Sequence, residues 1–192
     1  MRRLIAFEMV SLDGYFVDAH GEMSWARRQD PEWTGFAAEN ATGGSDLLFG
    51  RVTYEMMASF WPTSQAIQTM PAAATGMNQA RKFVFSRTLD SASWNNTSVL
   101  KGDIATEVRT LKRAQGPPMV VLGSGSIVAQ LAPQQLIDEL QIVITPLALG
   151  GGRTLFNGAR EPLHFRRSRT RSFSNGNVLL CFEPDQRPAL GP

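Results

Sequence analysis

Apolar residues along the chain gather in short runs that are rich in β-branched and aromatic side chains. Gly, Ser, Asp or Pro bounds most of these runs, a pattern that predicts strands. The predicted strands are Leu4–Val10, Asp46–Phe49, Lys82–Phe85, Thr97–Leu100, Met119–Leu122, Leu140–Thr145 and Val178–Phe182. The segments between them are of helical type, and the predicted helices are Pro31–Thr42, Thr53–Phe60, Met77–Ala80, Asp103–Ala114 and Ser126–Leu131.

This alternation of strands and helices predicts an α/β domain with a mostly parallel central sheet and helices on both faces. From Leu140 onward, strands follow one another with no strong helix between them, which predicts an antiparallel C-terminal hairpin at a sheet edge. The sequence has no internal repeat and no domain boundary, so residues 1–184 are expected to form a single domain. Residues 185–192 are Pro-rich and aperiodic, and are expected to be a loose tail.

Two aspartates stand where helices are predicted to begin. In "DIATEVRTLKRAQG", Asp103 precedes apolar residues at helical spacing and is predicted to be the N-cap. Asp30 stands immediately before Pro31, the combination that favours an N-cap followed by a first-turn proline.

Composition narrows the class of protein. With 192 residues, 43% hydrophobic and 19% charged, the chain fits an ordinary soluble globular domain, and a net charge of +2 gives no indication of nucleic-acid binding. Cys181 is the only cysteine and the two histidines are far apart, so neither a disulfide framework nor a metal site is expected. The lack of a disulfide framework favours a cytoplasmic location. The apolar run Ile142–Leu149 is much shorter than the ~20 residues that span a membrane.

Two glycine-containing turns join a strand directly to a helix. "LLFGRVT" passes through Gly50 to Arg51 and Thr53, and "VVLGSGSIV" passes through residues 123–126. A helix N-terminus carries unpaired N–H groups and partial positive charge, and glycine lets a phosphate approach them. The alternative is that both are merely tight turns.

A third strand end adds a cation. Ser86, Arg87 and Thr88 follow the strand that ends at Phe85, and they suit a ribose 2′-phosphate. Taken alone, Arg87 would more often be a solvated surface residue. Three such strand ends together favour a dinucleotide, although neither a P-loop nor a complete G-x-G-x-x-G is present.

The order of "SLDGY", Trp25, "LLFGRVTYE", "FVFSRT", "VVLGSGSI" and "PLALGGGRTLF" resembles the dihydrofolate reductase superfamily. Within it, the sequence is most similar to the branch that contains the C-terminal reductase domain of the bifunctional riboflavin-biosynthesis enzyme, over about Arg3–Glu183. The resemblance implies a three-layer α/β/α domain that binds NADPH across the sheet and forms a homodimer. The cofactor residues that it implies are Ala6, Gly50, Arg51, Val52, Thr53, Ser86, Arg87, Leu122, Gly123, Ser124, Gly125, Ser126 and Ile127.

The resemblance says less about the substrate. Asp13 of "SLDG" would face the pocket and bind substrate or tune a proton transfer, or it is a turn residue that satisfies its own backbone. Tyr15 stands where the riboflavin enzyme has a basic residue, which disfavours the riboflavin intermediate itself. Phe60 and Trp61 would form an aromatic wall or pack in the core. The substrate residues implied are Asp13, Tyr15, Trp25, Phe60, Trp61 and Gly151, with Asp13 also the candidate catalytic residue.

Asp30 follows Trp25 at the spacing of the folate reducers' proton-delivering carboxylate, but different flanking residues favour the N-cap role. The expected function is an NADPH-dependent reductase of a small heterocyclic or sugar-like substrate, of the 5-amino-6-(5-phosphoribosylamino)uracil reductase type. The alternatives are a non-catalytic NADPH-binding or nucleotide-binding protein of the same fold and a dihydrofolate reductase. A solvated basic strand at His164–Phe173 leaves a nucleic-acid binder as a third, disfavoured alternative.

Overall fold

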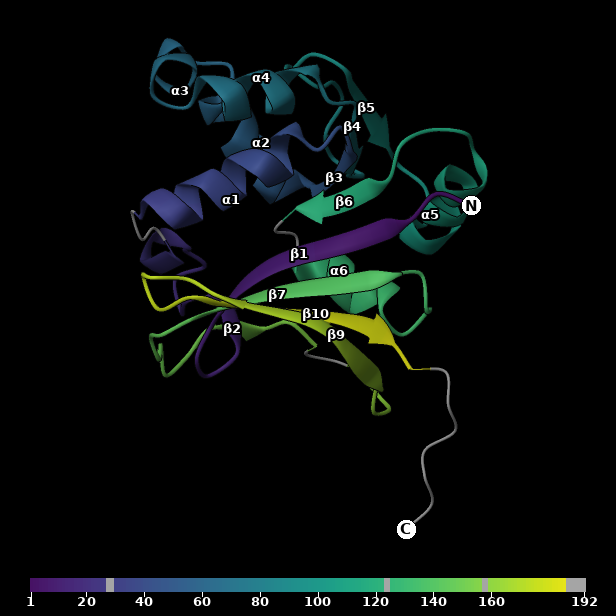
Figure 1. Cartoon of the computed structure of the whole chain (residues 1–192). Helices are drawn as coiled ribbons and strands as arrows, with labels where there is room; N and C mark the ends of the chain where they lie inside the picture. The colour runs from purple at the N-terminus through teal and green to yellow at the C-terminus, as the bar shows by residue number, and fades with distance from the viewer. Residues whose placement is uncertain (27–29, 123–124, 157–158, 186–192) are drawn as a thin grey trace.

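The computed structural model describes residues 1–26, 30–122, 125–156 and 159–185. Its centre is an eight-stranded sheet in the order β5-β4-β3-β6-β1-β7-β10-β9 (Figure 1). The strands are β1 (Leu4–Ser11), β3 (Asp46–Gly50), β4 (Lys82–Phe85), β5 (Thr97–Leu100), β6 (Met119–Leu122), β7 (Glu139–Thr145), β9 (Phe165–Ser172) and β10 (Val178–Pro184). A separate two-stranded ribbon pairs β2 (Tyr15–Val17) with β8 (Arg153–Thr154).

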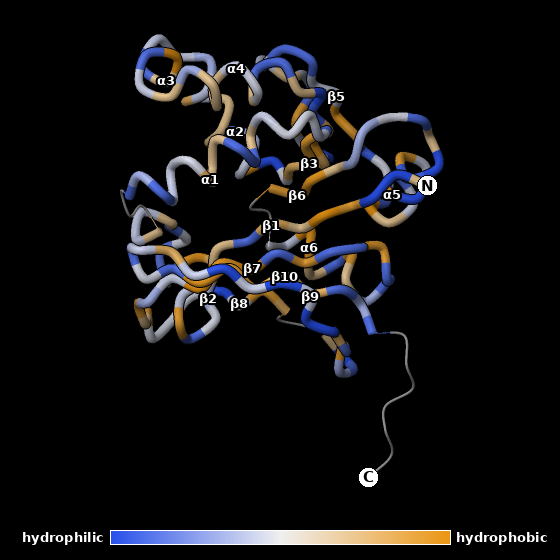
Figure 2. The backbone as a smooth tube through the Cα atoms, viewed as in Figure 1, coloured by the Kyte–Doolittle hydropathy of each residue, from blue (hydrophilic) through white to orange (hydrophobic). Residues whose placement is uncertain are grey.

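The strands from β5 to β7 run parallel, whereas β10 is antiparallel to β7 and β9 is antiparallel to β10. The predicted parallel sheet with an antiparallel C-terminal hairpin is therefore confirmed. In Figure 2 the central strands β3 and β6 are mainly orange and the edge strand β9 is mainly blue. This contrast follows from burial, because parallel central strands are covered on both faces while β9 exposes nearly every residue.

Helices cover both faces of the sheet, which confirms the three-layer arrangement. One face carries α1 (Pro31–Thr42), α2 (Arg51–Phe60) and α4 (Pro71–Gln79), and the other carries α5 (Ile104–Arg113) and α6 (Gly125–Leu131). Two further short elements are η1 (Ser24–Ala26) and α3 (Ser64–Thr69), of which α3 is labelled in Figure 1.

The N-cap predictions are confirmed. The Asp103 carboxylate accepts the Thr106 N–H at 2.9 Å, and the Asp30 carboxylate accepts the Trp33 N–H at 3.0 Å. Ser174 donates a second hydrogen bond to Asp30 at 2.6 Å, so this carboxylate also ties α1 to the turn between β9 and β10.

Three helix predictions need correction. The helix predicted at Met77–Ala80 runs over Pro71–Gln79, because a proline in the first turn starts it earlier. Helix α3 was not predicted, since the polar sequence SQAIQT shows no apolar periodicity. Helix α2 begins at Arg51 rather than Thr53, because Gly50 is already the extended N-cap with φ −79° and ψ 160°.

Candidate functional site

The parallel strands end together along one side of the sheet, which we call the carboxyl edge; the opposite side, where they begin, is the amino edge. Strands β4, β3 and β6 are neighbours, and Gly50 at the end of β3 lies opposite Phe85 at the end of β4. The three segments predicted to bind the cofactor therefore follow adjacent strand ends. Of these segments, Gly123 and Ser124 lie outside the described residues. Open α/β sheets bind ligands at this edge.

The turn from β3 to α2 has Gly50 as the helix N-cap, a residue that supplies no side-chain cap of its own. Arg51 is the first helical residue, and its guanidinium donates to both carboxylate oxygens of Glu55, at 3.1 and 2.8 Å. The two side chains are 45% and 47% exposed, so this pair is weak and another anion can compete for Arg51. Val52 is exposed beside it, and Thr53 is half-buried.

The end of β4 places a cation at the surface. The Ser86 hydroxyl accepts the backbone N–H groups of Thr88 and Leu89 at 3.2 and 3.0 Å, which closes a tight turn. Arg87 lies within this turn and is exposed. The two predicted residues thus differ, since Ser86 shapes the turn and Arg87 is the group that faces solvent.

The start of α6 is packed too closely for any side chain at Gly125. A Cβ atom added there would lie 2.8 Å from the Phe16 ring, well inside contact distance. Ile127 is buried in the core, so only its backbone remains for a ligand, whereas Ser126 is exposed and Leu122 is half-buried at the strand end. Glycine at position 125 therefore allows the Phe16 ring to pack against the start of α6.

Ala6, which is predicted to contact the nicotinamide, lies inside the sheet near the end of the pairing between β1 and β6. Ala6 lies within the ladders to both β6 and β7, opposite Val121 and Leu140. The ladder to β6 ends at Phe7, while the ladder to β7 continues to Ser11. Ala6 thus lies one residue before the end of the β6 ladder, and its backbone contact with the nicotinamide stays a prediction.

Asp13 is bound to a turn that is distant in sequence. Its carboxylate accepts the Ser11 hydroxyl at 2.6 Å, the Gly150 N–H at 2.7 Å and the Leu149 N–H at 3.0 Å. These hydrogen bonds, led by the one from Ser11, lower the pKa of Asp13 from 3.8 to about 2. The group is therefore ionised at neutral pH. The backbone of Leu149 was missed by sequence reasoning, since no side chain marks a contact that an N–H group makes.

Phe60 and Trp61 contact each other edge to face, with ring centroids 5.2 Å apart, but they lie far from the start of α2. Helix α2 has ten residues and spans about 15 Å, so Phe60 and Trp61 lie at the end opposite Gly50. The Trp61 side chain packs against the core under α2, and its indole nitrogen lies 3.1 Å from the Met57 sulfur. For Trp61 the structure therefore matches core packing, the second of the two alternatives.

The remaining predicted substrate residues belong to elements around the ends of β1 and β7. Tyr15 pairs with Thr154 in the ribbon, and Gly151 lies in the turn that leads to β8. Trp25 is half-buried in η1, where its indole N–H donates to the Glu22 carbonyl at 3.1 Å.

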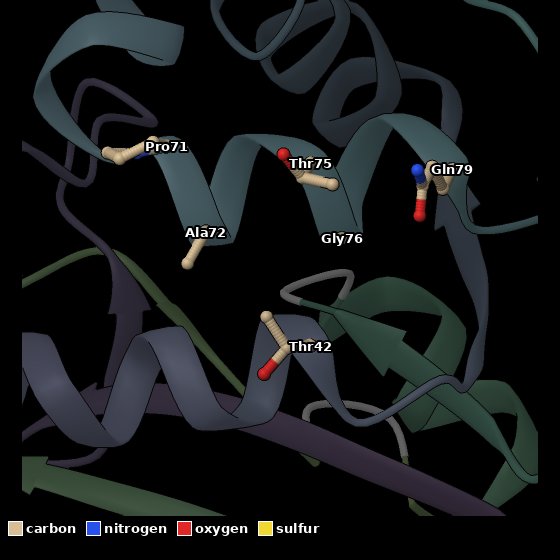
Figure 3. Close-up of a pocket in the computed structure, with 6 residues that line it drawn as sticks. All are labelled: Thr42, Pro71, Ala72, Thr75, Gly76 and Gln79. Carbon is tan, nitrogen blue, oxygen red and sulfur yellow. The ribbon is translucent and has the colours of Figure 1, made fainter.

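A hollow of about 530 Å³ lies between the ends of α1 and α4, where Figure 3 shows Thr42 below and the α4 residues above. It is lined by Thr42, Pro71, Ala72, Thr75, Gly76 and Gln79. Both helices lead into strands here, so the hollow belongs to the amino edge, and none of its lining residues is titratable. It is therefore separate from the candidate site.

Within the described ranges, no group of three or more His, Cys, Asp and Glu residues is placed to hold a metal ion. The described helices also include none that is both long and apolar enough to cross a membrane.

The sequence of the chain matches a known protein family and curated relatives. The family described as the RibD C-terminal domain matches residues 2–179. The uncharacterized protein YyaP of Bacillus subtilis is 28% identical over 183 residues, which cover 94% of each chain.

Two solved structures share the fold. One is a diaminohydroxyphosphoribosylaminopyrimidine deaminase/5-amino-6-(5-phosphoribosylamino)uracil reductase from Thermotoga maritima, with 16% identity and a TM-score of 0.67 over 96% of this chain and 57% of that one. The other is a dihydrofolate reductase from Enterococcus faecalis complexed with NADP(H), with 15% identity and a TM-score of 0.65 over 96% of this chain and 97% of that one. Because the family matches nearly the whole length, the chain belongs to the RibD C-terminal domain family.

Proposed function

We propose that this protein is an NADPH-dependent reductase of a small heterocyclic or sugar-like substrate. The observation that carries the proposal is the row of adjacent strand ends at the carboxyl edge, with Arg51 at the helix start that follows Gly50 and Arg87 in the turn after β4. This row occurs in a chain whose structural neighbours include reductases. The 5-amino-6-(5-phosphoribosylamino)uracil reductase type is the finer form of the proposal.

The residues of the carboxyl edge fit a dinucleotide. The start of α2 follows a glycine N-cap and carries Arg51, and a helix N-terminus with an adjacent cation suits the pyrophosphate. At the start of α6, where the Phe16 ring covers Gly125, the exposed Ser126 is the side chain available to the dinucleotide, and the exposed Arg87 suits the 2′-phosphate. NADPH, when bound, supplies the hydride, while the protein orients the reactants and excludes water.

The state of Asp13 bears on the source of the proton. A carboxylic acid with a pKa of about 2 carries almost no proton at neutral pH, so Asp13 is a poor general acid. We therefore propose that solvent supplies the proton, and that Asp13 contributes by holding the turn after β7 in place.

Two measurements test the proposal. Fluorescence titration of the purified protein with NADPH should give saturable binding. NADPH oxidation should then follow addition of one member of a substrate panel: a ribosylaminopyrimidine, dihydrofolate, other pterins and sugar-like carbonyl compounds. Failure to bind NADPH at millimolar concentration would contradict the proposal, and turnover of dihydrofolate alone would make the protein a dihydrofolate reductase.

A non-catalytic NADPH-binding protein is the second candidate. The observation in its favour is that the Asp13 carboxylate, the candidate catalytic group, is held ionised by hydrogen bonds from the Ser11 hydroxyl and from the backbone N–H groups of Gly150 and Leu149. Tight NADPH binding with no turnover across the whole panel would support this candidate over the reductase.

A further inference from the structure

Two turns at the carboxyl edge are joined by side-chain and backbone hydrogen bonds. The Asp13 carboxylate accepts N–H groups from Leu149 and Gly150, which stand 136 and 137 positions away in sequence. The Leu12 N–H donates to the Leu147 carbonyl at 2.7 Å, so the two turns are linked at a second point. The Ser11 hydroxyl donates to the same carboxylate at 2.6 Å. Asp13 thus bridges the end of β1 and the turn after β7.

The link continues into the ribbon of β2 and β8. Val17 pairs with Arg153, and the preceding Gly152 has φ +139°. A Cβ atom on Gly152 would lie 2.0 Å from the Val17 carbonyl oxygen, so the two strands touch backbone to backbone. Any displacement of the turn after β7 would therefore be passed to β2.

The ribbon in turn packs on the first residue of α6. The Phe16 side chain of β2 is 8% exposed, and its ring covers Gly125. The Arg153 guanidinium lies over the ring of Phe16, 5.3 Å from its centroid. Phe16 is thereby fixed between β8 and the helix start to which the proposed function assigns part of the dinucleotide.

We propose that Asp13 is a positioning residue, which holds the turn after β7 and, through the β2–β8 ribbon and Phe16, sets the geometry at the start of α6. The positioning itself stands on the contacts of the folded chain. Its effect on NADPH rests on the proposed function. Nothing in this role requires Asp13 to touch substrate or to transfer a proton.

The test compares Asp13→Ala and Asp13→Asn with a matched control, Asp18→Ala. Asp18 also accepts backbone N–H groups, from His20 and Glu22 at 2.9 Å each, but both lie in its own turn. Hydrogen exchange followed by mass spectrometry should show faster exchange over residues 147–152 in Asp13→Ala and unchanged exchange there in Asp18→Ala. Asp13→Asn should fall between wild type and Asp13→Ala, because one amide oxygen still accepts.

The same variants are titrated with NADPH. Asp13→Ala should raise the Kd by roughly three- to thirty-fold, the range found for residues that act on a site through packing. The pH profile of kcat should keep its shape, and Asp13→Asn should recover part of the affinity. An altered pH profile or a loss of kcat, with exchange and Kd unchanged, would overturn the positioning role in favour of a catalytic one.

The two proposals can fail separately. If the wild type binds no NADPH, the proposed function fails, while the exchange data still decide whether Asp13 holds the turn. If the wild type binds NADPH but residues 147–152 exchange alike in all variants, the positioning role alone is overturned.

Discussion

The two edges of the sheet differ in where their charged side chains lie: the amino edge has buried ion pairs, and the carboxyl edge has exposed charged groups. At the amino edge, Arg2 pairs with Asp46, and both side chains are only 4% exposed. Arg81 adds a second guanidinium to Asp46, at 2.7 and 3.1 Å. Lys112, also buried, is paired with Asp138. These ion pairs offset the cost of burial, because an isolated buried ion is very costly.

At the carboxyl edge the charged groups lie at the surface. Arg51 has an exposed partner one helical turn away, Arg87 faces solvent, and Asp13 binds backbone N–H groups in an exposed turn. Exposed cations whose partners are weakly held can exchange them for a phosphate. The buried ion pairs of the amino edge therefore stabilise the fold, whereas the exposed arginines of the carboxyl edge can bind a ligand.

The largest effect is expected at the amino edge. Asp46→Ala would leave the Arg2 guanidinium buried without its carboxylate, and should lower the free energy of unfolding by about 3–5 kcal/mol. Denaturant unfolding measures this value. The control Asp90→Ala removes a carboxylate that is 95% exposed and 3.3 Å from Lys101, and should cost about 1 kcal/mol or less. Equal losses for both variants would break the distinction between the edges.

Lys82, the first residue of β4, gives the next largest effect. Its ammonium group is buried and donates to the carbonyls of Asn78, Ala80 and Asn95 at 3.1, 2.7 and 3.2 Å. Lys82→Met removes the donor from these carbonyls and should cost about 1–3 kcal/mol in denaturant unfolding. A variant as stable as wild type would show that water reaches these groups.

The pH dependence of this site has a definite sign. Burial lowers the pKa of Lys82 from 10.5 to about 8. Between these values the unfolded chain binds more protons at Lys82 than the folded protein, so this residue's contribution to stability rises with pH. Unfolding curves measured from pH 7 to pH 10 should show this rise in wild type relative to Lys82→Met. A difference that falls over this range would contradict the assignment.

A smaller, local effect is expected at the carboxyl edge. The amide proton shifts of Leu149 and Gly150 should titrate with the Asp13 pKa of about 2 in an NMR pH series. Because this pKa is depressed from 3.8, the stabilisation from Asp13 is complete above about pH 5 and is lost as pH falls through about 2. Asp13→Asn should abolish the titration. A wild-type midpoint at or above 3.8 would mean that the turn is not held.

Much of the sheet could be predicted because its signals are local. Strands β4, β5 and β6 were expected at their observed bounds, since each is a short apolar run between turn residues. The caps Asp30 and Asp103 were likewise found from their immediate neighbours.

The remaining features depend on contacts that local patterns do not encode. The ribbon strands β2 and β8 have three and two residues, too few for a periodic signal. The Asp13 hydrogen bonds reach backbone N–H groups 136 positions away, and no side chain marks those groups. The need for glycine at 125 arises from Phe16, which only the folded chain brings there.

The central claim, that a phosphorylated dinucleotide binds at the carboxyl edge, is tested most directly by titrating NADPH and NADH against Arg87→Ala. The control is Arg113→Ala, since Arg113 is an exposed arginine in the last turn of α5, toward the amino edge. Loss of a charged contact to the 2′-phosphate should weaken NADPH by roughly ten-fold or more. The account predicts this loss for Arg87→Ala with little change for NADH, and wild-type affinities for Arg113→Ala. Equal weakening of both coenzymes by Arg87→Ala, or unchanged NADPH affinity, would contradict it.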